Sequence, residues 1–152
     1  MSGRVVVIGD ALIDELRDDT GVREFVGGAA LNVAVGIARL GVPTTLIAMV
    51  GDDQAGAHIR TYLDAKAAYA RRTGAFEHRL VIPGTQRDVS GNVCALPSVR
   101  VAPNNGYRWP LGTRPLADLL RELKPDVVQL HDPFWAPRAA VAAARSVGAR
   151  VV

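Results

Sequence analysis

The chain has 152 residues, of which 49% are hydrophobic and 22% charged, a balance that is typical of one globular domain and excludes a disordered segment. No apolar run is long enough to span a membrane, and the first residues are typical of a strand rather than a signal peptide, so we expect a cytoplasmic protein without membrane contacts. The net charge is only +3 and the arginines are scattered without interleaved aromatic residues, so we expect no nucleic-acid partner.

The first part of the chain alternates between strand and helix patterns. Residues 4–10, RVVVIGD, form a β-branched run closed by Gly-Asp, which is typical of a strand buried on both faces of a parallel sheet. Residues 11–26 predict two short strands around an Asp-Asp-Thr-Gly turn. Residues 29–41 have helical spacing and end at a glycine that is soon followed by a proline, and residues 44–51 predict a second buried strand.

The middle of the chain begins with a long helix and then becomes irregular. Residues 54–74 predict this helix, with Asp52 or Asp53 as its N-cap and Gly74 as its stop. Residues 78–84, HRLVIPG, predict a third parallel strand. The next stretch, up to residue 113, contains Pro, Gly and Asn throughout, and we expect only one strand in it, around the sequence NVCAL.

The last part returns to the alternating pattern. Residues 114–125 predict a helix with Pro115 near its first turn and Pro125 as its stop. Residues 126–133, DVVQLHDP, predict a fourth buried strand, and a helix over 136–149 leads to a strand that starts at residue 150. The alternation predicts an α/β fold: a Rossmann-like parallel sheet of about five strands with helices on both faces, plus a small strand pair.

Polar residues and glycines gather around the predicted end of the first strand. Asp10 and Asp14 flank that end, Gly27 and Gly28 precede the next helix, and Asn32 lies in its first turn. Glycines allow close backbone approach, a helix start offers free N–H groups, and an amide both donates and accepts hydrogen bonds. Ligands of open α/β sheets bind at the carboxyl ends of strands. Two carboxylates and an amide at this place suit a polyol, so a small sugar is the expected ligand.

The three histidines and the single cysteine are further candidates for a role at a site. His131 follows a predicted strand and could orient a ligand, although a histidine hydrogen-bonded at the sheet edge is the alternative. His58 and His78 have no second ligand at metal spacing, so we expect no metal. Cys94 is the single cysteine, and we expect a small buried hydrophobe. No anion cradle for a nucleotide is visible, so we assign no catalytic residue and no cofactor.

Seven residues around the Gly-Gly pair have the spacing of a known sequence signature: Gly27, Gly28, Ala30, Asn32, Ala34, Gly41 and Gly51. Together with the following segment VGDDQAG, it resembles the first signature of the ribokinase-like, or PfkB, carbohydrate kinases over residues 4–63. The resemblance implies that Asp14 binds sugar hydroxyls, that Gly28 and Asn32 line the same site, and that residues 11–26 form a lid over it. That family carries its catalytic aspartate in a Gly-Ala-Gly-Asp type motif near its C-terminus, and no part of these 152 residues matches it.

A second set of residues follows a different pattern: Asp126, Val127, Val128, Leu130, His131, Asp132 and Pro133. It is similar to the DVVHLHDP segment of the N-terminal domain of GT-B glycosyltransferases of family 4, and this resemblance covers residues 66–152. The C-terminal domain of those enzymes, which binds the sugar nucleotide, has no counterpart in the chain.

The two resemblances meet within the helix predicted over residues 54–74. The charge also changes near this point, because residues 1–64 carry a net charge of −4 and residues 65–152 a net charge of +7. We therefore expect one composite α/β domain over residues 1–152. It would consist of a ribokinase-like segment, 1–65, and a glycosyltransferase-like segment, 66–152.

The composite organisation favours a recombined or chimeric chain without catalysis, because neither family's catalytic end is matched. The alternative is a carbohydrate-handling transferase fragment, similar to a sugar kinase, that binds a sugar at the Gly-Gly and Asn site. Whether the chain is an enzyme stays open. The strand pair over residues 11–26 would have unpaired edges, so we also expect a homo-oligomer through this segment.

Overall fold

The structure is a computed structural model that describes residues 3–51, 53–70, 76–84, 88–90, 93–100, 108–131 and 137–152. The strands are β1 (Val5–Asp10), β2 (Leu12–Asp18), β3 (Gly21–Gly27), β4 (Thr44–Met49), β5 (Phe76–Gly84), β6 (Asp88–Ser90), β7 (Val93–Arg100), β8 (Arg108–Pro110), β9 (Val127–Leu130) and β10 (Arg150–Val151). The helices are α1 (Ala29–Arg39), α2 (Gln54–Ala70), α3 (Arg114–Leu123) and α4 (Pro137–Ser146).

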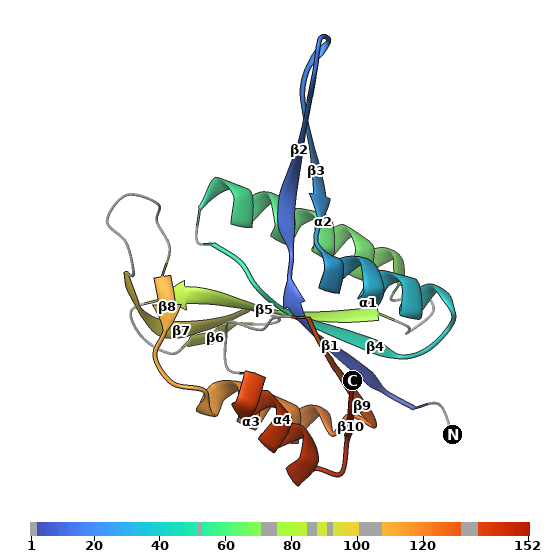
Figure 1. Cartoon of the computed structure of the whole chain (residues 1–152), viewed down its shortest axis with the longest axis vertical. Coiled ribbons are helices and arrows are strands. Elements are labelled where there is room, and N and C mark those ends of the chain that lie inside the picture. Colours follow the sequence, from blue (N-terminus) through green and yellow to red (C-terminus); the bar gives the residue numbers. More distant parts are fainter. Residues whose placement is uncertain are drawn as a thin grey trace.

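The main sheet has the strand order β10-β9-β1-β4-β5-β7-β6, and β8 pairs with β7 (Figure 1). The strands from β10 to β7 are parallel to one another, while β6 and β8 run antiparallel to β7. The predicted α/β class is therefore confirmed, with six parallel strands in place of about five. Between β5 and α3 the described residues form β6, β7 and β8, where only one strand was expected, around NVCAL.

Pairing with β5 explains why β7 forms despite its turn-favouring neighbours. The backbone of β7 pairs with β5 from Val93 onward, and the side chain of Leu96 is buried in the core. Pro97 pairs with the last residue of β5, so its missing N–H falls at the end of this ladder. Tertiary pairing here overrides the local signals that favoured an irregular segment.

Helices cover both faces of the main sheet: α1 and α2 lie on one face, and α3 and α4 lie on the other (Figure 1). Side chains alternate along β1, so that Val7 packs with α1 and α2 while Val6 and Ile8 pack toward α3 and α4. The core cluster on the α3 and α4 face contains Val6, Ile8, Ile47, Val81, Leu96, Leu116, Leu120, Leu123, Val128, Ala140, Ala143, Ala144 and Ala149. The cluster on the α1 and α2 face contains Val7, Ala11, Ala30, Leu31, Ala34, Leu46, Ala48, Val50, Ile59 and Leu63.

Helix α2 runs without a break through the place where the two sequence resemblances meet. Asp53 is its N-cap, because the Asp53 carboxylate accepts a hydrogen bond of 2.8 Å from the Gly56 N–H. Leu63 is fully buried between α2 and the sheet. The expected stop at Gly74 lies outside the described residues.

The strands β2 and β3 form a separate antiparallel hairpin that projects from the body of the protein (Figure 1). Its turn is stabilised by the Asp18 carboxylate, which accepts hydrogen bonds from the hydroxyl and the N–H of Thr20. Gly21 completes the turn with a φ of 131°. The predicted small strand pair is therefore confirmed.

Among the described residues, no helix is long and apolar enough to cross a membrane.

Candidate functional site

The chain path brings the candidate residues of the first half to one place. β1 ends at Asp10, the hairpin leaves and returns at Gly27, and α1 begins at Ala29. The base of the hairpin, the carboxyl end of β1 and the N-terminus of α1 are therefore neighbours. This is the edge of the sheet where ligands bind in open α/β folds.

The Asp10 carboxylate caps α1. Its two oxygens accept hydrogen bonds of 3.2 Å from the N–H groups of Ala29 and Ala30. Gly28, which occupies the N-cap position, has no side chain that could do this. The start of α1 therefore offers fewer free N–H groups than the sequence suggested, and Asp10 holds the helix in position rather than projecting freely toward a ligand.

Close approach of two aspartates explains the Gly-Gly pair. A Cβ on Gly28 would lie 2.8 Å from the Asp10 carbonyl oxygen, and the residue has a φ of 114°, which side chains rarely tolerate. A Cβ on Gly27 would overlap the carboxylate of Asp14. Gly28 is thus required by the backbone geometry, and Gly27 leaves room for the Asp14 carboxylate in the position it occupies.

The Asp14 carboxylate and the Asn32 amide remain unengaged. Asp14 is exposed on β2, and the side chain has no hydrogen bond or ion pair with any described residue. Asn32 is exposed on the first turn of α1, next to the buried Leu31, and its side chain likewise has no partner within the described part of the chain. A carboxylate acceptor and an amide are therefore available to a ligand at the base of the hairpin.

His131 lies at the same edge of the sheet, immediately after β9. Its N–H donates a hydrogen bond of 2.8 Å to the Ile8 carbonyl oxygen of the neighbouring β1. Its Nε2 atom is buried and has no hydrogen-bond partner among the described residues. Neither the ligand-orienting role nor the alternative of a hydrogen-bonded side chain is decided by these contacts, and both stay predictions.

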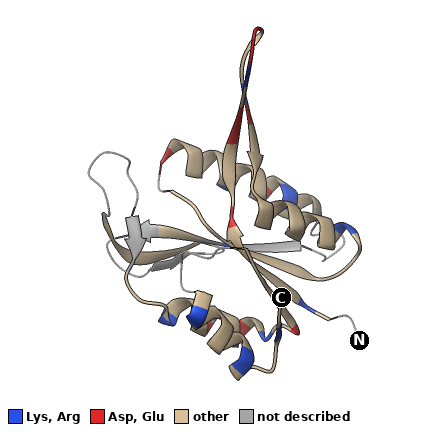
Figure 2. Ribbon diagram, viewed as in Figure 1, with Lys and Arg blue, Asp and Glu red and all other residues tan. Residues whose placement is uncertain are grey.

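Charged residues line the hairpin (Figure 2). Arg17 pairs with Glu15, and Arg23 pairs with Asp18, both at 2.6 Å in exposed positions where such pairs contribute little. The hydrogen bond from the Thr20 hydroxyl, followed by that from its N–H, lowers the pKa of Asp18 from its ordinary value.

Two other expectations concern metal binding and the single cysteine. Within the described ranges, no group of three or more His, Cys, Asp or Glu side chains is placed to hold a metal ion. Cys94 is half-buried and packs against the core cluster that also contains Val81.

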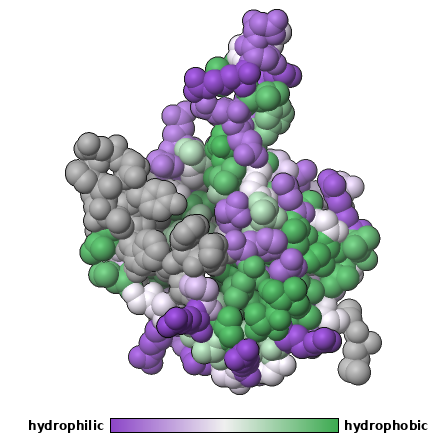
Figure 3. Space-filling view, viewed as in Figure 1, coloured by the Kyte–Doolittle hydropathy of each residue, from purple (hydrophilic) through white to green (hydrophobic). Residues whose placement is uncertain are grey.

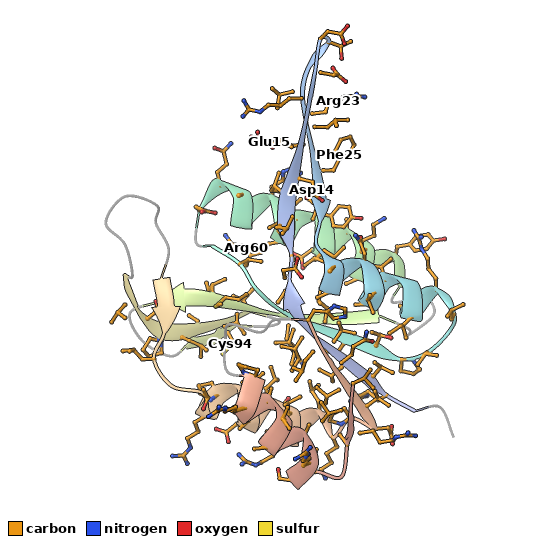
Figure 4. The ribbon with its side chains drawn as sticks, viewed as in Figure 1. Asp14, Glu15, Arg23, Phe25, Arg60 and Cys94 are labelled. Carbon is orange, nitrogen blue, oxygen red and sulfur yellow. The ribbon has the colours of Figure 1, made fainter. Side chains whose placement is uncertain are left out.

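Sequence reasoning missed two apolar residues beside the site. Leu16 and Phe25 lie on the same face of the hairpin as Asp14, since the register pairs Asp14 with Phe25 and Leu16 with Arg23. Figure 4 shows Phe25 and Arg23 on one side of the hairpin and Glu15 on the other. The alternation of side chains along the two strands could have identified this face from the sequence.

The first half of the chain is similar to carbohydrate kinases. Residues 2–72 match the family model described as pfkB family carbohydrate kinase. The chain is 48% identical over 61 residues to a fructokinase from Klebsiella pneumoniae, which is 40% of this chain and 20% of that protein. It is 52% identical over 58 residues to a fructokinase from Escherichia coli, which is 38% of this chain and 19% of that protein. The chain thus aligns with about one fifth of the length of these curated relatives.

A third relative aligns with a longer stretch. The chain is 29% identical over 108 residues to 5-dehydro-2-deoxygluconokinase from Photobacterium profundum, which is 66% of this chain and 29% of that protein. Because residues 2–72 are less than half of the chain, this alignment includes residues beyond the family match. Similarity to a carbohydrate kinase therefore does not stop at the end of the first segment.

Solved structures extend the likeness in fold to nearly the whole chain. Fructokinase from Halothermothrix orenii superposes with a TM-score of 0.59 and 21% identity over 97% of this chain and 55% of that one. Fructokinase from Xylella fastidiosa gives 0.57 and 19% over 99% and 50%. The fold of the described residues, including those after residue 65, is similar to that of these fructokinases. The expected glycosyltransferase segment and chimeric origin receive no support from these comparisons.

Proposed function

We propose that this chain provides the sugar-binding part of a PfkB-type carbohydrate kinase and holds a small polyol at the base of the β2–β3 hairpin. The observation that carries the proposal is the Asp14 carboxylate, which lies against Gly27 and has no partner among the described residues. A carboxylate without a partner is a strong acceptor for sugar hydroxyls. The family match over residues 2–72 supports the same assignment.

The neighbouring residues have distinct roles in this proposal. Asn32 donates to and accepts from a second hydroxyl, and Gly27 and Gly28 leave room for the ligand beside the backbone. Asp10 is a positioning residue that holds the start of α1. His131, which follows β9 at the same sheet edge, would orient the ligand.

Phosphoryl transfer is a separate question from binding. The relatives named above are fructokinases, that is, kinases by name. Phosphoryl transfer requires positioned phosphates and stabilisation of their charge. No residue among the 152 is assigned to these tasks, because the Gly-Ala-Gly-Asp type motif is not matched. We therefore propose that this chain binds the sugar and does not by itself transfer phosphate.

The alternative is a chimeric chain that folds without binding a sugar. The charge difference between residues 1–64 and 65–152 favours it. The continuous α2 helix and the carbohydrate-kinase fold on both sides of it favour the kinase proposal.

Thermal unfolding with millimolar D-fructose, D-ribose or D-glucose tests the proposal. At least one sugar should raise the melting temperature, because a ligand that binds only the folded state stabilises it. Asp14→Asn and Asn32→Ala should abolish the rise. The matched control is Glu15→Gln, the adjacent carboxylate on the opposite face of β2, which should retain it. If no sugar shifts the wild-type protein, sugar binding is refuted.

An ATP turnover assay tests the second half of the proposal. Release of ADP should stay at background with every sugar in the panel. Sugar-dependent ADP release by the purified chain, lost in Asp14→Asn, would refute the statement that this chain does not transfer phosphate.

The unpaired edges of the hairpin also support a proposal about partners. Within the described part of the chain, β2 and β3 pair only with each other, and the side chain of Val22 near the tip is 56% exposed. We propose that residues 11–26 mediate self-association of the chain through these edges.

A further inference from the structure

The face of the β2–β3 hairpin that is turned toward α2 changes character along its length. Next to the body of the protein, Ile13 and Val26 lie opposite each other on the two strands and pack against the core cluster on the α1 and α2 face. The next pair on the same face is Glu15 opposite Glu24, and both residues are exposed. The outer end of the hairpin is mostly hydrophilic (Figure 3). The two glutamates thus follow directly on the apolar contact that anchors the hairpin.

Glu15 and Glu24 form an unfavourable cross-strand pair. Residues directly opposite each other in an antiparallel ladder have neighbouring side chains, and like charges in such a pair are destabilising. The charge of Glu15 is compensated within the hairpin, because the Arg17 guanidinium binds its carboxylate at 2.6 Å. The carboxylate of Glu24 instead approaches His58 of α2, with 4.0 Å between the carboxylate oxygen and Nδ1. Compensation of Glu24 therefore comes from a different element and requires a protonated imidazole.

The strength of the contact between Glu24 and His58 depends on the charge of the imidazole. A separation of 4.0 Å is too long for a hydrogen bond, so a neutral imidazole offers Glu24 no direct bond. Histidine is the side chain that ordinarily gains a proton between about pH 8 and pH 5. The protonated ring would attract Glu24 and offset its repulsion from Glu15. The attraction between the hairpin and α2 should therefore grow as the pH falls.

The other ionisable groups around His58 do not share this pH range. Among the described residues, those on the adjoining turns of α2, at its N-cap and on this face of the hairpin belong to types that ordinarily titrate outside about pH 5 to 8: Glu15, Glu24, Arg17, Asp53, Tyr62 and Lys66. Of β5, which packs against α2, the described side chain in the core cluster on this face is Ile82, and it carries no charge. Within this set, a change of charge near neutral pH falls on His58.

We propose that His58 and Glu24 form a pH-dependent latch, which holds the β2–β3 hairpin against α2 when the imidazole is protonated and releases the outer part of the hairpin when it is neutral. Ile13 and Val26 stay packed at the base and act as the hinge. The two latch side chains are 49% and 53% exposed, so the attraction is small. It should change the ratio of held to released hairpin by about two- to five-fold.

The latch goes beyond the proposed function and does not require a bound sugar. Asp14 lies on the opposite face of the same hairpin, so movement of the hairpin would also move its carboxylate relative to α1. The held position is favoured at pH values below the range in which histidine titrates, and it is lost as the pH rises through that range.

Residual dipolar couplings of the backbone amides test the latch, because they report the orientation of the hairpin relative to the main sheet. They are measured on the purified chain in dilute solution at about pH 5.5 and about pH 7.5. The couplings of β2 and β3 should decrease at the higher pH through averaging over released positions, while those of the main sheet stay the same. Sodium chloride at about 1 M should weaken the response, because it screens exposed charges. Hairpin couplings that do not change with pH would overturn the proposal.

Three variants assign the response to the latch. His58→Asn, which cannot gain a charge, should show the released couplings at both pH values. His58→Lys, which carries a positive charge at both, should show the held couplings throughout. Glu24→Gln should lose the pH response, and a response that survives in this variant would overturn the pairing with His58. All three replace half-exposed side chains outside the two core clusters, so the fold should be retained.

The matched control is His78→Asn, which removes a histidine from β5 in the interior of the main sheet. This variant should keep the wild-type response of the hairpin couplings to pH. If the response is lost in His78→Asn and retained in His58→Asn, the pH effect belongs to the sheet and the latch is refuted.

Discussion

The carboxylate of Asp14 lies so close to Gly27 that a Cβ at position 27 would overlap it. The absence of a side chain on one strand of the hairpin thus determines where the carboxylate on the other strand can lie. Replacing the glycine should affect the position of the carboxylate more than the stability of the fold, because the overlapping atoms belong to an exposed side chain that can rotate.

We therefore predict that Gly27→Ala abolishes any rise in melting temperature caused by a sugar, because Asp14 rotates away from the site. The free energy of unfolding without ligand should change by less than about 1 kcal/mol. Calorimetry with and without D-fructose, D-ribose or D-glucose measures both quantities. A variant that retains the full sugar-dependent rise would show that the position of Asp14 is irrelevant to binding.

Gly28→Ala should destabilise the protein by about 1–3 kcal/mol, because the new Cβ would meet the Asp10 main chain and the positive φ would be strained. The control is Gly36→Ala in the middle of α1, where a Cβ would meet no atom within 4 Å. That change should stabilise the protein by about 0.5–1 kcal/mol, since alanine favours helix. Urea unfolding of both variants should give shifts of opposite sign.

The hairpin turn should lose stability in acid. The Thr20 hydroxyl holds the pKa of Asp18 below its ordinary value of 3.8, so the ionised carboxylate stabilises the folded turn. This contribution is fully present above the unfolded value and is lost as the pH falls through the lower folded value. NMR titration of the Thr20 amide should follow this transition, and Asp18→Asn should remove it. An unchanged Asp18 titration in Thr20→Val would contradict the assigned cause.

Self-association through residues 11–26 should appear as a rise in sedimentation coefficient with protein concentration. Val22→Lys should weaken it, because a lysine on an exposed strand edge opposes pairing with another chain. A wild-type protein that remains strictly monomeric at high concentration would rule out this mode of association.

Leu63→Ala should destabilise the protein by about 2–5 kcal/mol, because a fully buried leucine is removed from the junction between the segments. Circular dichroism reports the whole chain, whereas both tryptophans, Trp109 and Trp135, lie in the second segment. If the two segments unfold together, Leu63→Ala should lower the midpoint of urea unfolding equally in both signals. Separate midpoints would show that they unfold independently.

Much of the secondary structure could be predicted because its signals are local. The run Val5–Asp10, the stop after α1 and the Asp53 cap of α2 all depend on residues within a few positions of one another. The strand β7 could not be predicted at its full length, because it pairs with β5 across a segment that contains many turn-forming residues. The glycosyltransferase resemblance also rested on a local pattern, a buried strand followed by polar residues. Different Rossmann-like sheets share this pattern.

The sequence by itself determined the α/β alternation, the position of the hairpin and the Gly-Gly turn beside Asp14, since side-chain periodicity and glycine conformation act over a few residues. Only the tertiary structure decided the strand order and the capping of α1 by Asp10, which lies 19 residues before Ala29. It also decided which face of the hairpin packs against α2 and which leaves Asp14 and Phe25 exposed. These features depend on contacts between residues distant in the chain, and local propensities do not encode them.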